Sequence, residues 1–382
     1  MTAVKEAFHG SDLEKVEAVY GIPKEKIVSF AANVNPLGIS GKMKRELAGH
    51  LDVVTSYPDR EYKALRETIA GYTGTTAERV LVGNGSTELI SLFIRTEHPV
   101  KAVILGPTYS EYEREIALSG GESTYYPLPE DSDFILDVDS FCEALGEDTD
   151  LVVLCNPNNP TSTALSTGEI EKILQSCGKK GIFVSIDETY AEFADDLAGI
   201  SAIPLCGKYD NLIVLRGTSK FFACPGIRLG YAICGNAELR EAMRSSQNPW
   251  SLNSLADLAG QSMMADTEYQ KETWELIDSE RRRMISVLRS WKSVKVYPAR
   301  ANFIFMKILR KDVTAGDLFV HCIKKGLMIR DCSTFPFLGD RYVRFCVMLP
   351  ADNDRLLAAM AELLCPEESD TQAASSDGAV TG

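Results

Sequence analysis

The sequence predicts an α/β fold: a mostly parallel seven-stranded sheet with helices on both faces, together with a smaller α+β domain. Seven short apolar runs suited to buried strands occupy the middle of the chain, and longer stretches with helical spacing separate most of them. From about residue 261 this alternation gives way to a different pattern. Buried strands that alternate with helices are typical of parallel sheets covered on both faces.

The apolar runs define the expected strands, and the spacing of apolar residues defines the helices. The strands are expected at 79–82, 102–105, 123–127, 151–155, 182–186, 211–215 and 229–234, with helices that include 42–50, 88–95, 110–119 and 166–179. The C-terminal part predicts a long helix at about 268–290, a helix near 314–325, and apolar runs at 294–298, 302–308, 327–332 and 342–349.

These patterns divide the chain into four parts. Residues 41–260 form the expected large domain and 261–365 the small one, and 1–40 are expected to pack with the small domain. Residues 366–382 contain four acids, no base and no aromatic residue, which predicts a disordered tail.

Composition limits the classes of partner. The 382 residues include 40 Lys and Arg against 54 Asp and Glu, a formal charge of −14, so we expect neither nucleic-acid nor membrane-surface binding. A local basic pocket for a small anion remains compatible with this charge. Ten cysteines without a Cys-x-x-Cys pair and four scattered histidines predict no metal site, and together with a polar N-terminal stretch they indicate a cytoplasmic protein.

Ligands of parallel sheets bind at the carboxyl ends of the strands, so the residues that follow each strand are candidates for a site. Gly85, Ser86 and Thr87 follow the first run and open a helix, where backbone N–H groups suit a phosphate. Position 88 is Glu and no Gly-Lys-Ser/Thr follows, so neither the dinucleotide fingerprint nor a P-loop is present. An ordinary strand-to-helix turn is the alternative for this segment.

Other strand ends also carry polar or aromatic residues. Taken singly, Tyr109 reads as a packed aromatic residue, Asp187 as a helix cap and Lys220 as a solvated charge. The Asn/Pro cluster at 156–161 is more specific, because it would be a costly way to make a plain turn.

Together these residue types match the requirements of pyridoxal 5′-phosphate. A lysine can form a Schiff base with an aldehyde cofactor, and an aspartate can keep a pyridine nitrogen protonated so that the ring becomes an electron sink. An Asn and a Tyr can hydrogen-bond a phenolate oxygen, while glycine-rich N–H groups and an arginine can hold a phosphate. Their joint occurrence at strand ends is a stronger signal than any one of them.

These motifs are family-defining: Asn-Pro-Asn-Asn-Pro-Thr at 156–161, Asp-x-x-Tyr at 187–190, and Ser-Lys at 219–220 followed by Gly-x-Arg-Leu-Gly at 226–230. Through them the chain resembles the fold-type I aminotransferase superfamily, class I/II branch, over 8–365. The resemblance implies Lys220 as the Schiff-base lysine, Asp187 as the partner of the pyridine nitrogen, and Asn159 and Tyr190 beside the phenolate oxygen. It further implies phosphate binding by Gly85, Ser86, Thr87, Ser219 and Arg228, and stacking by Tyr109. Family members often have Ser or Thr at the position of Gly217, and we expect Thr218 to rebuild that part of the phosphate cup.

The resemblance also extends to the subunit partner and to the substrate. Tyr57 matches a tyrosine that reaches the phosphate of the partner subunit, which implies a homodimer. Arg344 matches the arginine that grips the substrate carboxylate or an equivalent anion, and Arg330 matches a second one. The remaining substrate-binding residues implied are His9, Gly10, Asn33 and Asn159.

Within the superfamily the chain is similar to the histidinol-phosphate aminotransferases and the threonine-phosphate decarboxylases. Three features favour the decarboxylases: the spacing of 8–10 from 30–38, the segment 248–253, and the matches at 297–302 and 329–332. This implies a pyridoxal-phosphate-dependent carboxy-lyase that acts on L-threonine or L-serine O-phosphate, the first with a role in cobalamin biosynthesis. The alternatives are an aminotransferase of a phosphorylated amino alcohol or amino acid with 2-oxoglutarate, and a non-catalytic binding module.

Overall fold

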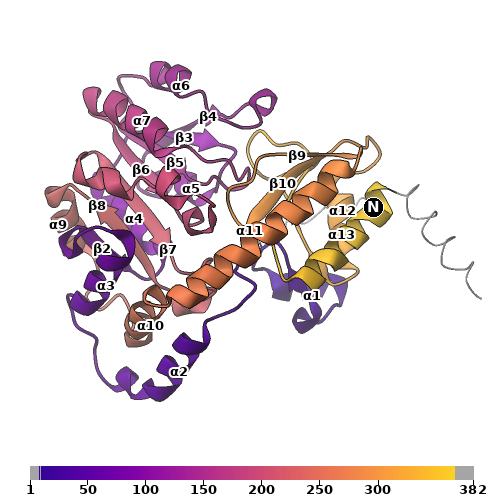
Figure 1. The fold of residues 1–382 in the computed structure, drawn as a ribbon. Helices are drawn as coiled ribbons and strands as arrows, with labels where there is room; N and C mark the ends of the chain where they lie inside the picture. The colour runs from indigo at the N-terminus through magenta and orange to yellow at the C-terminus, as the bar shows by residue number, and fades with distance from the viewer. Residues whose placement is uncertain (1–7, 9, 366–382) are drawn as a thin grey trace, which may run out of the picture.

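The computed structural model describes Phe8 and residues 10–365, and a seven-stranded sheet forms its larger part (Figure 1). The strand order is β2-β8-β7-β6-β5-β3-β4, and β8 runs antiparallel to its two neighbours while the other pairs are parallel. The predicted fold class is thus confirmed, and each strand overlaps one predicted run. The strands are β2 Val80–Gly83, β3 Lys101–Gly106, β4 Glu122–Pro127, β5 Leu151–Cys155, β6 Phe183–Asp187, β7 Leu212–Gly217 and β8 Gly230–Cys234.

Helices cover both faces of this sheet, because successive side chains of its central strands point to opposite faces and both sets are buried. On β7, Ile213 and Leu215 pack into a cluster with α4, α5 and α9, whereas Leu212 and Val214 face the cluster that contains α3, α6, α7 and α10. These helices are α3 Lys63–Thr73, α4 Ser86–Glu97, α5 Glu111–Leu118, α6 Val138–Ala144, α7 Thr167–Lys179, α9 Ala237–Ser246 and α10 Ser254–Met264, and the short α8 is Leu197–Ile200.

A second, antiparallel sheet of four strands lies at the other end of the molecule, in the order β12-β13-β10-β9. The long helix α11 runs from the neighbourhood of α10 to this sheet (Figure 1). The predicted run at 327–332 splits into β11, in a two-stranded sheet, and β12, in the four-stranded one. The elements are α11 Thr267–Ser290, β9 Val294–Val296, β10 Phe303–Ile308, α12 Ala315–Ile323, β11 Leu327–Met328, β12 Arg330–Asp331, β13 Tyr342–Cys346 and α13 Pro350–Leu364.

The N-terminal segment contacts β13 of the four-stranded sheet, where the Cys346 N–H donates to the Phe30 carbonyl at 2.8 Å, and it also reaches the turn after β7. Strand β1, Val28–Ser29, pairs in parallel with β11, and the Phe8 ring stacks on Phe319 of α12 at 5.6 Å. Further along, the Asn35 backbone N–H donates to the Lys220 carbonyl at 3.0 Å. We call residues 21–40 the N-terminal strap; they lie between helices α1 Leu13–Tyr20 and α2 Gly41–Gly49. The expected tail at 366–382 lies outside the described residues.

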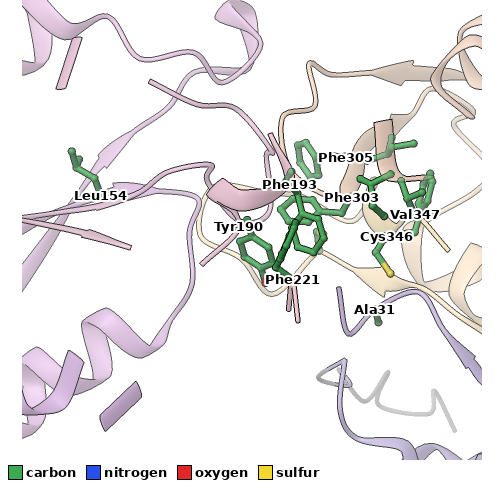
Figure 2. Packing of buried hydrophobic residues seen from close by; sticks show 14 of the residues in the cluster. Ala31, Leu154, Tyr190, Phe193, Phe221, Phe303, Phe305, Cys346 and Val347 are labelled. Atoms are coloured by element: carbon green, nitrogen blue, oxygen red, sulfur yellow. The ribbon is translucent and has the colours of Figure 1, made fainter. Parts of the chain in front are cut away.

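Aromatic packing joins the two sheets close to the strap. Figure 2 shows Tyr190, Phe193 and Phe221 from the segments that follow β6 and β7 beside Phe303 and Phe305 of β10. The Tyr190 and Phe303 rings meet edge to face at 5.0 Å, and those of Phe193 and Phe221 lie 5.2 Å apart. Edge-to-face pairs of this kind stabilise a buried contact beyond the area they remove from water. Throughout the described part of the chain, no helix is long and apolar enough to cross a membrane.

Candidate active site

The carboxyl ends of the parallel strands open into a cavity of about 320 Å³ between the two sheets and the N-terminal strap. Such strand ends are where α/β sheets bind ligands. Twelve of the predicted site residues line this one cavity: Asn33, Gly85, Ser86, Thr87, Tyr109, Asn159, Asp187, Tyr190, Ser219, Lys220, Arg228 and Arg344.

Lys220 lies just beyond the end of β7, and its ammonium group is largely shielded from water. Its Nζ donates to the Ala32 carbonyl at 2.6 Å, in the strap that crosses the cavity. Burial, and secondarily the positive charge of Arg344, lower the pKa of Lys220 to about 8. At a pKa of about 8, roughly a tenth of this amine is neutral at pH 7, far more than for an ordinary lysine, and the neutral amine can act as a nucleophile and proton carrier.

Asp187 ends β6 and is 6% exposed. Its Oδ1 accepts from the backbone N–H and the hydroxyl of Thr189 at 2.9 and 2.6 Å, and its Oδ2 accepts from the Tyr112 hydroxyl at 2.7 Å. Burial raises the pKa of Asp187, and these bonds lower it in part. Among the described residues no cation lies within ion-pair distance of this carboxylate, so a cation in the cavity would stabilise its charged form.

The Asn/Pro cluster positions one amide toward the cavity and uses two to fix its own loop. Asn156 donates to the carbonyls of Leu165 and Ile200, and Asn158 donates to that of Pro107. Asn159 instead lines the cavity, where its Oδ1 accepts from Arg344 Nη1. Asn156 and Asn158 thus fix the loop that places the Asn159 amide, itself 7% exposed, at the wall of the cavity.

Tyr190 also lines the cavity, with a phenol that remains protonated at neutral pH. Its hydroxyl accepts from Asn33 Nδ2 at 3.3 Å, and burial raises the pKa of Tyr190 to about 12. Asn33 Oδ1, also buried, has no hydrogen-bond partner in the described structure. Tyr190 and Asn33 both line the cavity, so the hydroxyl hydrogen of Tyr190 remains available to a ligand there.

The N-terminus of α4 and Arg228 form a cradle for an anion. Gly85 precedes the helix with φ 83°, and a Cβ there would collide with the Arg228 guanidinium. The helix has no side-chain cap at this end, so the N–H groups of its first turn face the cavity where Gly85, Ser86 and Thr87 line it. Free N–H groups at a helix N-terminus, with an arginine beside them, suit a phosphate.

The structure differs from the expectation for Thr218. The Thr218 side chain is 1% exposed, and its hydroxyl donates to the Leu229 carbonyl at 3.0 Å instead of facing the cavity. A Cβ at Gly217 would lie 3.2 Å from Ser86 Oγ and 3.7 Å from Ser219 Oγ. The strand alternation thus directs Thr218 into the core, and the hydroxyls nearest Gly217 are those of Ser86 and Ser219.

Arg330 and Arg344 form a second positive feature next to the cofactor-sized cavity. They are register partners across β12 and β13, and both line a smaller cavity of about 80 Å³ that shares Tyr109 and Asn159 with the larger one. Arg330 Nη2 donates to the Thr334 hydroxyl at 3.0 Å and Arg344 Nη2 to the Ala31 carbonyl at 2.8 Å. Burial, then Arg344, lower the pKa of Arg330. Neither has an ion-pair partner among the described carboxylates, so an anion would offset their mutual repulsion.

The remaining predicted site residues lie at different places. Gly10 lines the smaller cavity and packs on the Ala31 backbone so closely that a Cβ would not fit. Tyr57 is 80% exposed and lies outside both cavities, beside Trp250 with ring centroids 4.8 Å apart. His9 is outside the described residues.

Sequence reasoning missed several residues that complete the site. Tyr112 and Thr189 hold the Asp187 carboxylate, and Thr334 holds Arg330. Thr189 had a detectable signal, since an Asp with a Thr two residues later is a common local hydrogen-bonding pattern. Tyr112 and Thr334 had none, because their contacts cross from one element to another.

The residues present fit pyridoxal 5′-phosphate on the structure alone. A buried carboxylate without a cation, a lysine of lowered pKa and a phosphate cradle surround one cavity of about 320 Å³. No group of three or more His, Cys, Asp and Glu side chains that could hold a metal ion occurs within Phe8 and residues 10–365.

The sequence is similar to a family model and to curated enzymes over most of its length. The family model for aminotransferase class I and II matches residues 25–360. Threonine-phosphate decarboxylase of Salmonella typhimurium is 35% identical over 93% of this chain and 96% of its own. Histidinol-phosphate aminotransferase of Desulfitobacterium hafniense is also 35% identical, over 88% of this chain and 92% of its own.

Solved structures agree with this fold. Histidinol-phosphate aminotransferase of Clostridium acetobutylicum superposes with a TM-score of 0.82 at 29% identity, over 87% of this chain and 98% of that one. The enzyme of the same name from Sinorhizobium meliloti, solved in complex with pyridoxal-5′-phosphate, has a TM-score of 0.80 at 21% identity, over 92% of this chain and 94% of that one.

Proposed function

The chain belongs to the class I and II aminotransferase family and uses pyridoxal 5′-phosphate, and from that premise we propose that it decarboxylates an O-phosphorylated hydroxy-amino acid. L-Threonine O-phosphate and L-serine O-phosphate are the proposed substrates, and the products are the corresponding amino-alcohol phosphates. The observation that carries this proposal is the Arg330–Arg344 pair beside the main cavity, two guanidinium groups to which no carboxylate of Phe8 and residues 10–365 is paired.

This pair suits a substrate with two anionic groups. Guanidinium forks bind carboxylate and phosphate in bidentate fashion, and in a chain of net charge −14 such a site depends on local cations. Arg344 also contacts Asn159, so an anion on Arg344 lies beside the cofactor site, while Arg330 and Thr334 extend the site away from it. Both anions of an O-phospho-amino acid therefore find a cation.

The chain's own residues would hold the cofactor and move the protons. Lys220 Nζ would attach it, the cradle of Ser86, Thr87, Ser219 and Arg228 would bind its phosphate, and Asp187 would accept a hydrogen bond from its ring nitrogen. When bound, pyridoxal 5′-phosphate supplies an electron sink for the charge left on Cα when one of its bonds breaks. Lys220 Nζ, with a pKa of about 8, can then deliver the proton that replaces the carboxylate on Cα.

Which Cα bond breaks depends on where the substrate anions are anchored. Similarity to threonine-phosphate decarboxylase over 93% of the chain favours loss of the carboxylate. Similarity to histidinol-phosphate aminotransferases favours a second candidate, transamination of a phosphorylated amino alcohol, which the same arginines could also serve.

The deciding experiment offers O-phosphothreonine or O-phosphoserine to the purified holoenzyme without any keto acid. Carbon dioxide release supports the decarboxylase. If the substrate is consumed only when 2-oxoglutarate is added, and glutamate forms, the enzyme is an aminotransferase instead.

Arg330→Ala tests whether the site recognises phosphate. We expect kcat/KM for O-phosphothreonine to fall about 100-fold, because a charge-assisted bidentate contact is lost, while an unphosphorylated analogue changes little. An equal fall in kcat/KM for both substrates would show that Arg330 does not recognise the phosphate.

We also propose a homodimer. Four large apolar side chains, each more than 40% exposed, come from two segments that meet at the Tyr57–Trp250 contact: Leu51, Val54, Tyr57 and Trp250. A second copy of the chain would cover this apolar surface. A mass of about 42 kDa in light scattering, with full activity at that concentration, would contradict the dimer.

A further inference from the structure

Tyr112 is a buried residue to which neither the family resemblance nor the proposed mechanism assigns a role. It is the second residue of α5, is 2% exposed, and lines the main cavity. Its hydroxyl donates to Asp187 Oδ2 at 2.7 Å across a sequence separation of 75 residues. A phenol that only filled space would not need to meet this carboxylate.

The hydrogen bonds of Asp187 leave one acceptor position open. Each carboxylate oxygen can accept about two hydrogen bonds. Oδ1 is filled by the backbone N–H and the hydroxyl of Thr189, whereas Oδ2 has Tyr112 as its one donor in the described structure. The remaining lone pair of Oδ2 belongs to a side chain that lines the cavity.

The surroundings of Asp187 make the Tyr112 bond important for its charge. The titratable groups that face it are Tyr109, Tyr112, Cys155 and Tyr190, none of which is a cation. Burial raises the pKa of Asp187, and the hydrogen bonds from Thr189 and Tyr112 oppose that rise. Burial also raises the pKa of Tyr112 well above its ordinary value, so the phenol keeps its proton and remains a donor.

We propose that Tyr112 is a positioning residue for the reaction: its hydroxyl fixes the Asp187 carboxylate so that the open lone pair of Oδ2 receives the N–H of the cofactor ring. Thr189 holds the other oxygen, so the two residues together fix the rotation of the carboxylate. The contact between Asp187 and the cofactor rests on the proposed function, whereas the hold of Tyr112 on Asp187 does not require it.

Tyr112→Phe tests this with minimal change of shape. Tyr231→Phe is the matched control, since Tyr231 is 1% exposed and donates at 3.3 Å to a different buried carboxylate, that of Glu192. The Asp187 titration is followed in the cofactor-free protein by NMR with ¹³C-labelled aspartate carboxyl groups. Asp187→Asn identifies the resonance, because that signal disappears in the variant.

We expect Tyr112→Phe to raise the pKa of Asp187, because an ionised acceptor loses a donor, and Tyr231→Phe to leave it unchanged. In the holoenzyme, Tyr112→Phe should lower kcat about tenfold with little change in KM, since the substrate anions bind elsewhere. An Asp187 titration identical to that of the unmodified protein, or an equal shift in Tyr231→Phe, would overturn the inference.

The role of Asp187 and the role of Tyr112 can be contradicted separately. If Asp187→Asn retains normal turnover, the role of Asp187 in the proposed function is wrong, whatever Tyr112 does. If Asp187→Asn is inactive but Tyr112→Phe behaves as the unmodified protein in both titration and kcat, the proposed function stands and Tyr112 is only a packing residue.

Discussion

Asp187 and Glu188 are consecutive acids at the end of β6 and both are buried, but they differ in their hydrogen-bond donors. Glu188 is fully buried and accepts from Arg216 Nη2 at 2.7 Å and Nε at 3.0 Å, and also from Ser201 and the Ala202 N–H. Asp187, 6% exposed, has neutral donors alone among the described residues. Successive residues point to opposite sides of a strand, so one acid reaches the core and the other the cavity.

In the core, Glu188 and Glu192 form an ion cluster with Arg216, so the negative charges there have a cation of the same chain beside them. Burial raises the pKa of Glu192, and Arg216 lies 4.0 Å from its Oε1. On the cavity side, the described residues provide no cation for Asp187 and no anion for the pair of Arg330 and Arg344. A buried charge whose partner lies within the chain makes the fold depend on that partner, and a charge left without one at a cavity indicates a ligand of the opposite sign.

Lys220→Ala should have the largest effect on activity and little on stability. Turnover is expected to fall about 10⁴-fold, because both the attachment of the cofactor and a proton carrier are lost. Borohydride reduction followed by peptide mapping should find cofactor on Lys220 in the unmodified protein and none in the variant. Cofactor trapped on a different lysine would contradict the assignment.

Asp187→Asn should separate catalysis from stability most clearly. We expect kcat to fall about 10³-fold while the cofactor still binds, since the charge that stabilises a protonated ring nitrogen is gone. The cofactor-free protein should be as stable as before or more so, because a buried carboxylate without a cation is replaced by a neutral amide. A lower Tm of the cofactor-free variant would break the contrast with Glu188.

Arg216→Met should show the reverse pattern. Removal of the one cation leaves Glu188 and Glu192 buried together, and we expect the free energy of unfolding to fall by about 3–5 kcal/mol. Denaturant titration measures this change. The triple variant Glu188→Gln, Glu192→Gln, Arg216→Met should recover much of the loss, and a loss of the same size in the triple variant would show that the paired charges are not its source.

Glu130→Gln extends the comparison to a carboxylate that is partly exposed to water. Burial would raise the pKa of Glu130, but hydrogen bonds from Lys307, Tyr342 and Tyr297 lower it to about 2. The native pKa is thus below the ordinary value of 4.5, so the stabilisation is present above about pH 4.5 and is lost as the pH falls toward 2. The unmodified protein should lose more stability than Glu130→Gln over this range, by a small amount because the side chain is 32% exposed. Parallel pH profiles of Tm would contradict this.

The sequence predicted the parts of the molecule that depend on local pattern. All seven strands of the large sheet overlap a predicted run. Strands such as β5, β6 and β7 were predictable because a strand buried on both faces is apolar along most of its length, whereas the edge strand β4 is exposed or half-buried throughout. The apolar run at 327–332 predicted a single strand, because the local pattern does not show that Ile329 separates two strands of different sheets. Thr218 was misplaced because the alternation of β7 continues past Gly217 and directs its hydroxyl to Leu229.

The site itself was predictable where a motif carries the chemistry, and not where it depends on tertiary contact. Twelve predicted residues line one cavity because each follows the end of a strand or lies on the strap and small sheet that close over those ends. The pairing of Arg330 with Arg344, and the bond from Tyr112 to Asp187, depend on register and on helix packing, which no local pattern specifies. These contacts distinguish the incomplete charges of the site from the complete ones of the core.

The most direct test of the proposed decarboxylation is a single NMR experiment on the holoenzyme in D₂O with O-phospho-L-threonine and no keto acid. The proposed function predicts steady accumulation of 1-amino-2-propanol phosphate that carries one deuterium on the carbon which lost the carboxylate, with its nitrogen retained. Substrate that keeps its carboxylate and exchanges only its Cα hydrogen for deuterium, with no amino-alcohol product, would contradict it.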